Sequence, residues 1–380
     1  LQPRLERVMR RLLGITAFLA LALLAVPDGT ATAAAGDFIY VTSQSAAAVS
    51  VIDAVSRKVV ATIDLTELGF SANCKPHHVA VEPDGSFWYV SLITDWRVLK
   101  FDRQNNLVGQ VEFETPGLLS LDPEFDVLYV GRSMAAVSPP MRIGRIVRST
   151  MELEEVDVFF PRPHALVAAA GGGLVYTASL AENRMAAVEP AEEVLELVDI
   201  PGDIHALVQF ALSPDGGTLV TGGQMSGEIL VFDLSEPLAP ELVKTFNIGG
   251  QPWHPVYAPD GKTVYFPQRT ANAVAVVDTE TWSLREQITG GGLVEPHGSA
   301  ISADGEGTLR TSNADTVAAA VAAAVGAEKL ILATTAPGIL ESRDDPRSMI
   351  SYLDIAGLTK LRDEGRLADG MLPKAAAIER

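Results

Sequence analysis

A turn signal that recurs about every 44 residues is the feature that most constrains the fold of this chain. Proline, aspartate, alanine and glycine form such turns at six places, and the second residues of successive turns are 40, 47, 44, 45 and 44 residues apart. The turns begin at Glu82, Asp122, Ala169, Ser213, Ala258 and Ser302. A period of this length indicates a repeat protein in which each unit is one supersecondary element.

Short β-rich runs fill the interval between turns. A run such as Phe87 to Leu92 follows the turn, and a second run ends in an acid, as in Val51-Ile52-Asp53. A third run comes next, for example Lys58 to Ile63. Short, evenly spaced strands separated by Gly, Asp and Pro turns are typical of four-stranded propeller blades. The sequence therefore predicts an all-β propeller with six recognisable repeats over residues 36–305, and a β-sandwich array is the alternative with the same spacing.

Three motifs carry a resemblance that covers about 270 residues. Tyr40-Val41-Thr42, Val51-Ile52-Asp53 and Pro214-Asp215-Gly216 resemble the motifs of YVTN-type β-propeller proteins. Members of that family often have seven blades, so a complete six-bladed ring and a truncated seven-bladed one both stay open. Gly298 to Ser302 reads as a last innermost strand, and its pairing with Phe38 to Thr42 would close six blades without an exposed edge. The resemblance implies the fold and not the activity, since such propellers serve as enzymes, binding modules and surface proteins.

Residues 1–35 are predicted to be a secretory signal peptide. Four arginines precede an apolar run from Leu12 to Val26, and small residues from Thr30 to Ala35 supply a cleavage site. A membrane anchor is the alternative, although this run is short for a spanning helix. We expect a periplasmic or secreted protein that has no membrane contact after cleavage.

The charge and the cysteine count exclude several partners and cofactors. The net charge is -19, and removal of four Arg and two acids with the signal gives -19 - 4 + 2 = -21. Nucleic acid and anionic membranes are therefore not expected as partners, because Lys and Arg would have to supply the attraction. The single cysteine, Cys74, excludes an intrachain disulfide, and the absence of a second Cys just before His77 excludes c-type haem.

All six histidines lie just ahead of a turn signal, in or near the strand expected to line the channel. They are His77, His78, His164, His205, His254 and His297. Counted back from the second turn residue, three lie at position -6, two at -5 and one, His205, at -9. Innermost strands of all blades run in one direction, so equal offsets mean equal depth. The sequence therefore predicts a histidine cluster at a channel mouth.

Imidazole nitrogen is a good ligand for copper, zinc, iron or nickel. The pattern is similar to the propeller domain of nitrous oxide reductases, where channel histidines hold a copper cluster, but no second copper domain follows here. We expect a binding module for a metal ion, copper or another transition metal, for a small anionic ligand, or for a protein. A copper-type periplasmic oxidoreductase is the alternative, as is a structural role in which the rings bond to backbone. Enzymatic activity stays open, and no catalytic residue is assigned.

The last 75 residues, 306–380, have a different, α/β character. The 44-residue period ends near Asn313, and the junction is predicted at residues 303–313. Helices are predicted at residues 314–325 and 354–362 and from residue 370, with a strand at 328–333 and a turn at 337–338. A gene fusion, a recombination event and an assembly artefact would each produce such a chain.

Four motifs of this segment resemble the C-terminal part of acetylglutamate kinases in the amino-acid kinase family. They are Asn313-Ala314-Asp315-Thr316, Gly326 to Leu332, Pro337 to Leu340 and Gly370 to Lys374. The resemblance implies that Asp315 organises phosphoryl transfer, that Lys374 stabilises charge on the phosphates and that Asn313 binds the acyl-amino acid. The N-terminal half of that family, with its phosphate-binding turn, has no counterpart here. Phosphoryl transfer needs donors from several elements, so we expect these residues to be vestigial, with no nucleotide bound and no kinase activity.

Overall fold

The computed structural model describes residues 38–53, 56, 58–290, 293–301, 310–312, 350, 354–365 and 367. The predicted signal peptide, the elements predicted at 314–338 and from residue 370, and the candidate residues Asn313, Asp315 and Lys374 lie outside the described residues. Among the described helices, none has the length and apolar character needed to cross a membrane.

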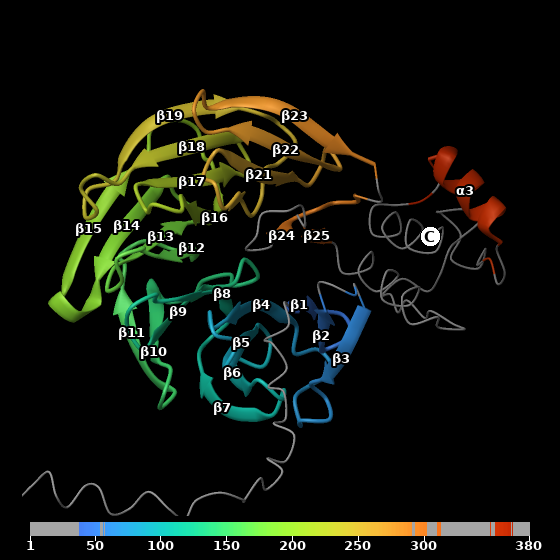
Figure 1. Cartoon of the computed structure of the whole chain (residues 1–380), viewed down its shortest axis with the longest axis horizontal. Helices are drawn as coiled ribbons and strands as arrows, with labels where there is room; N and C mark the ends of the chain where they lie inside the picture. Colours follow the sequence, from blue (N-terminus) through green and yellow to red (C-terminus); the bar gives the residue numbers. More distant parts are fainter. Residues whose placement is uncertain are drawn as a thin grey trace, which may run out of the picture. The chain divides into compact units, whose positions relative to one another are not determined.

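Small antiparallel sheets follow one another along the chain as the blades of a propeller (Figure 1). Blade 1 has three strands, β1 (Phe38–Ser43), β2 (Ala48–Asp53) and β3 (Lys58–Asp64). Five further blades each have four strands in chain order. Blade 2 consists of β4 (Pro76–Val81), β5 (Phe87–Leu92), β6 (Arg97–Asp102) and β7 (Leu107–Glu112). Blade 3 consists of β8 (Pro116–Leu121), β9 (Val127–Arg132), β10 (Arg142–Val147) and β11 (Glu152–Asp157).

The next three blades repeat this order. Blade 4 contains β12 (Pro163–Ala168), β13 (Val175–Ser179), β14 (Arg184–Glu189) and β15 (Val194–Asp199), with a 3₁₀ turn, η1 (Pro190–Glu192), before its last strand. Blade 5 contains β16 (Leu207–Leu212), β17 (Thr218–Gly223), β18 (Glu228–Asp233) and β19 (Glu241–Asn247). Blade 6 contains β20 (Val256–Tyr257), β21 (Thr263–Gln268), β22 (Ala273–Asp278) and β23 (Ser283–Thr289). The predicted propeller with six repeats is confirmed.

The last innermost strand does not close the ring as expected. β24 (Gly298–Ala300) pairs with β25 (Arg310–Ser312), with Ser299 opposite Thr311, and not with β1. We attribute this to chain length: nine residues separate β24 from β25, whereas nearly the whole propeller lies between β1 and β24. The entropy cost of closing a loop rises with its length, which favours the near partner.

The hydrophobic core lies between blades because the middle strands are covered on both faces. Trp88 in β5 is fully buried and stacks on Phe101 at 4.2 Å between ring centroids. Tyr40 of blade 1 contacts the same indole at 5.0 Å, so the first two blades share this cluster. Burial of one such side chain stabilises the fold by about 1.5–3 kcal/mol. In the outermost strands, partly buried and exposed residues alternate. In β11, for example, the charged residues are exposed and the two apolar residues are partly buried.

Side-chain hydroxyl groups join blade 1 to blade 2 and blade 2 to blade 3. Thr42 Oγ1 donates to the carbonyl of His77 at 3.0 Å, and Ser91 Oγ donates to that of Gly117 at 2.7 Å. Gly131 occupies the matching position in blade 3, where a Cβ atom would lie only 2.8 Å from the carbonyl oxygen of His164. The innermost strands of blades 2 and 3 are thereby held by the blade before them.

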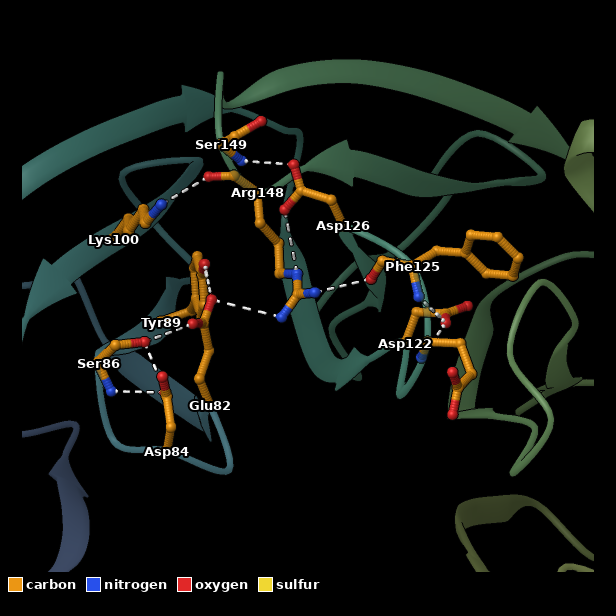
Figure 2. A network of polar contacts seen from close by, with 11 residues as sticks. Glu82, Asp84, Ser86, Tyr89, Lys100, Asp122, Phe125, Asp126, Arg148 and Ser149 are labelled. Atoms are coloured by element: carbon orange, nitrogen blue, oxygen red, sulfur yellow. Dashed lines mark hydrogen bonds and ion pairs between the residues drawn. The ribbon is translucent and has the colours of Figure 1, made fainter. Parts of the chain in front are cut away.

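A polar network joins blades 2 and 3 near Glu82, the residue that follows β4 (Figure 2). Arg148 Nη1 lies 3.4 Å from Glu82 Oε1, and Arg148 Nη2 donates to the carbonyl of Phe125 at 2.7 Å. Lys100 Nζ donates to the carbonyl of Arg148 at 2.7 Å and lies 4.0 Å from the centroid of the Phe87 ring. The network is at the opposite end of β4 from His77.

The helix predicted at residues 354–362 is confirmed as α3 (Ile355–Asp363). Asp354 caps it, because its Oδ1 accepts a hydrogen bond from the N–H of Gly357 at 2.8 Å. Leu358 and Leu361 are buried against Leu367.

Candidate functional site

Five of the six histidines lie together where innermost strands begin. His77 and His78 belong to the start of β4 and His164 to the start of β12, while His254 and His297 precede β20 and β24. The ring centroids of His77 and His164 are 6.3 Å apart, and those of His78 and His254 are 6.5 Å apart. The repeat thus brings together residues that are far apart in the sequence, and we call these five residues the histidine cluster.

Hydrogen bonds fix which ring nitrogen carries the proton in three of these residues. His164 Nδ1 donates to the carbonyl of Arg132 at 2.7 Å, and His297 Nδ1 lies 3.2 Å from the carbonyl of Glu295. Both rings therefore keep a lone pair on Nε2. His78 has the opposite arrangement, because its Nδ1 accepts from the N–H of Leu119 at 3.3 Å.

Three ring nitrogens of the cluster are buried without a hydrogen-bond partner among the described residues. They are His77 Nδ1, His164 Nε2 and His254 Nε2. A buried polar atom that lacks a partner is costly and marks a place where a ligand or an ion can be bound.

Burial lowers the pKa of His77 and of His78 to about 3, and that of His164 to about 4. The pKa of His254 is also held well below its usual value, first by burial and then by the other cluster histidines. These four imidazoles are therefore uncharged at neutral pH. Uncharged imidazole is the form that binds metal ions.

The buried side chain of Arg132 fixes the carbonyl that orients His164. Its Nη2 lies 2.7 Å from Glu155 Oε2, and its Nη1 and Nε donate to the carbonyls of Glu114 and Arg142 at 2.6 and 3.0 Å. With every guanidinium nitrogen bound, the last residue of β9 has little freedom. The ring of His164 is held with it.

His205 has a different set of contacts. Its Nε2 lies 3.0 Å from the carbonyl of Pro201, and its Nδ1 lies 3.0 Å from Ser226 Oγ and 3.3 Å from Glu228 Oε2. Both ring nitrogens are thus used within blade 5 and the loop before it. The separate offset of -9 in the sequence was the signal that distinguishes His205 from the other five.

Three further side chains lie close to the histidine cluster, those of Trp253, Arg269 and Arg162. The Trp253 ring is 5.8 Å from that of His254 and 5.4 Å from that of His297. The guanidinium of Arg269 lies 5.8 Å from the Trp253 ring. Arg162 is close enough to His164 for its charge to lower the histidine pKa further. The two arginines were not predicted from the sequence, although Arg162 lies only two residues before His164.

The cluster is arranged in pairs of rings. As the side chains stand, no group of three or more His, Cys, Asp or Glu within the described part of the chain could hold a metal ion. Two rings on opposite sides of one metal would have centroids about 6–7 Å apart at a metal–nitrogen distance of about 2.1 Å. Both ring pairs have this spacing, so a third ligand would require one ring to rotate.

Cys74 takes no part in the cluster. It is fully buried in the core shared by blades 1 and 2, next to Trp88 and Leu92. Burial raises the pKa of its thiol to about 11, so it is protonated at neutral pH. This residue packs as a small apolar side chain.

Residues 268–379 match the amino acid kinase family. The C-terminal segment is similar to acetylglutamate kinases. It is 51% identical over 74 residues to the chloroplastic enzyme of Arabidopsis thaliana, covering 20% of this chain and 21% of that protein. Identity to the Prochlorococcus marinus (strain MIT 9313) enzyme is 46% over 101 residues, 27% of this chain and 32% of that one. The chain thus spans between a fifth and a third of these relatives. The family match begins at the last residue of β21, so it includes β22 and β23, two of the four strands of blade 6.

Solved structures with a similar fold cover the propeller. A streptogramin B lyase has a TM-score of 0.61 at 14% identity, over 73% of this chain and 87% of that one. A chain of a mitotic checkpoint complex has a TM-score of 0.61 at 18% identity, over 74% and 82%. The hydrazine synthase of Kuenenia stuttgartiensis has 0.57 at 16% identity, over 71% and 87%. Identities this low show the fold alone, and the three proteins differ in what they do.

Proposed function

We propose that the propeller is an exported binding module that takes up a transition-metal ion at its channel mouth through the histidine cluster. The observation that carries the proposal is the set of buried ring nitrogens without partners, on His77, His164 and His254. Lone pairs on uncharged imidazoles suit copper and zinc. Carboxylates, which calcium and magnesium prefer, contribute none of the buried unpartnered atoms among the described residues.

The hydrogen bonds made by the other ring nitrogen of His164 and of His297 support this proposal. A histidine that binds a metal almost always donates its other ring N–H to a carbonyl, a carboxylate or water. His164 does so to Arg132, and the geometry of His297 and Glu295 is the same in kind. The pair of His77 and His164 supplies two unpartnered nitrogens and His254 supplies a third, while Nδ1 of His78 already accepts a hydrogen bond. Rotation of a ring, or a group of a bound ligand, completes the coordination.

A second candidate is a small anionic ligand. Arg162 and Arg269 lie near the cluster, and Arg162 Nε is buried without a partner among the described residues. Arginine suits carboxylates and phosphates because its planar group donates two parallel hydrogen bonds. The imidazoles would then act as neutral donors or acceptors around the anion.

The metal proposal is tested by elemental analysis of the exported form, purified without a His tag and loaded with copper or zinc. We expect about one metal ion per chain, and its loss in the His77→Asn, His164→Asn double variant. His205→Asn is the matched control, because it removes a buried histidine that lies outside the cluster. Equal metal content in the native chain and the double variant would refute the proposal. Titration with inorganic phosphate tests the anion, with Arg162→Met as its variant.

For the C-terminal segment we propose that kinase activity is absent. The match covers only part of the relatives, and the segment follows a propeller instead of the phosphate-binding half of a kinase. ADP release measured with ATP and acetylglutamate is expected to equal the blank. Release above the blank that disappears in Asp315→Asn would overturn this conclusion.

A further inference from the structure

Buried polar atoms without partners concentrate at the channel mouth. Among the described residues, nine buried side-chain nitrogen and oxygen atoms lack a hydrogen-bond partner. Six of them belong to residues that start an innermost strand or precede it closely: His77, Thr115, Arg162, His164, Trp253 and His254. The histidine nitrogens suit the proposed metal ion. Arg162 Nε and Trp253 Nε1 do not, because each is an N–H donor without a lone pair and needs an acceptor.

Arg162 is held in place by its backbone and by its side chain. Its carbonyl accepts from the N–H of Leu180 at 3.1 Å, and its Nη2 donates to the carbonyl of Met134 at 2.8 Å. Within the described part of the chain, its guanidinium thus bonds to a carbonyl and not to a carboxylate. Arg269 differs, because its Nη2 lies 3.5 Å from Glu295 Oε1. Arg162 is therefore the arginine of the mouth whose charge is left for an anion, since a partly buried charge without a counterion is costly.

An apolar patch lies beside these two donors. Its members are Met134, Leu180, Ala206, Val208 and Trp253. They come from blades 3, 4, 5 and 6, on the loops and strand starts at the end of the channel that holds the histidines. The Trp253 ring also lies 5.4 Å from that of His297, so it belongs both to the patch and to the surroundings of the histidine cluster. Donors, patch and cluster are thus neighbours at one mouth.

A ligand that satisfies these groups has an acceptor group and an apolar body. The two oxygens of a carboxylate match the N–H groups of Arg162 and Trp253, and its single negative charge matches one free arginine. An aromatic body suits the patch, because aromatic rings pack well at the face or edge of an indole. Phosphate offers no apolar surface, and the net charge of -19 opposes a multiply charged anion more strongly than a singly charged one.

We propose that the channel mouth binds a small aromatic carboxylate, with its carboxylate on Arg162 Nε and Trp253 Nε1 and its ring on the apolar patch. The inference rests on the proposed function, since it takes the channel mouth as a binding site and names the class of its anionic ligand. It does not require a bound metal. The carboxylate and a metal ion use different protein atoms, so both are accommodated together.

Isothermal titration calorimetry of the full chain at about pH 7, with a chelator present, tests the ligand class with sodium benzoate, sodium acetate and inorganic phosphate. Each further buried carbon strengthens binding by about fourfold, so we expect benzoate to bind at least about tenfold more tightly than acetate. Benzoate is also expected to bind more tightly than phosphate. Phosphate or acetate as tight as benzoate would refute the inference and leave a simple anion site. Absence of binding by all three would refute the anion site as well, while metal analysis decides the metal proposal separately.

Two variants test the donors in the same titration. Trp253→Phe keeps an aromatic ring without the N–H, and Arg162→Met keeps an unbranched stem without the charge. We expect each to weaken benzoate binding about tenfold or more, because each removes a hydrogen bond to a charged group. Trp282→Phe and Arg285→Met, in the outer part of blade 6, are the matched controls and should bind as the native chain does. Native affinity in Trp253→Phe and Arg162→Met, or an equal loss in the controls, would refute the assignment. If a variant does not fold, the comparison of the three anions in the native chain still decides.

Discussion

Mild acid is expected to destabilise the propeller through the histidine cluster. The pKa values of His77, His78 and His164 in the fold are about 3, 3 and 4, below the usual 6.5 that the unfolded chain has. The unfolded state therefore binds protons first as the pH falls. The stability due to the neutral rings is fully present above pH 6.5 and is lost towards pH 3–4.

The magnitude follows from these values. At about pH 5 each ring lies roughly 1.5 pH units below its unfolded pKa, and one unit corresponds to about 1.4 kcal/mol. Each histidine thus lowers the free energy of unfolding at about pH 5 by about 2 kcal/mol, and the three together lower it by about 6 kcal/mol. Domains are stable by about 5–15 kcal/mol, so a loss of this size is a large part of the whole.

The assay is urea unfolding followed by tryptophan fluorescence between about pH 7.5 and pH 5, in the presence of a chelator. His164→Asn retains an N–H for the Arg132 carbonyl but cannot titrate. We expect this variant to unfold with a smaller pH slope, by about 1.4 kcal/mol per pH unit. Exposed aspartates such as Asp84 and Asp102, whose pKa values are lowered by hydrogen bonds, affect stability only below about pH 4 and do not interfere. Identical slopes for the two proteins would refute the reasoning.

Three substitutions test the packing between and within blades. Gly144→Ala should cost about 1–3 kcal/mol, because its Cβ would lie 2.5 Å from Val130 Cγ1, whereas Gly171→Ala meets nothing within 4 Å and serves as its control. An unchanged thermal midpoint for Gly144→Ala would contradict this. Lys100→Met removes a buried hydrogen bond and a cation–π contact, for an expected loss of about 1–2 kcal/mol in urea unfolding. Thr42→Val should lower the free energy of unfolding by about 1 kcal/mol, because it removes a hydrogen bond between blades. Val60→Thr, at a solvent-exposed position, is the control. A loss of stability in the control alone would refute the assignment.

The blades were predictable because each turn is a local event. Runs such as Thr218 to Thr221 lie inside the observed strands, since alternating apolar residues and Asp-Gly turns specify strands without distant contacts. Helix α3 was predictable for a similar reason, because Asp354 provides its cap. Local patterning therefore accounts for most of the fold.

For the site, the sequence predicted only how deep along the channel each histidine lies. Equal offsets brought His77 and His164 to one level, but the offset cannot tell which way a ring turns or which carbonyl orients it. The bond from His164 to Arg132 and the two bonds of His205 are properties of side-chain packing. The pairing of β24 with β25 was not predictable either, because the sequence indicates where strands lie but not which strands pair.

Within the described residues β1 pairs on one edge only, with β2, and this affects how the fold opens. In the described part of the chain the main contacts run from each blade to the next along the sequence, from β1 to β4, β4 to β8, β8 to β12 and onwards to β24. When β24 pairs with β25, the blades behave as a row with two ends, whose stability is a sum of neighbouring interfaces. Amide hydrogens should then exchange fastest in blade 1 and β24 and slowest in blades 3 and 4, a gradient that a closed ring would abolish.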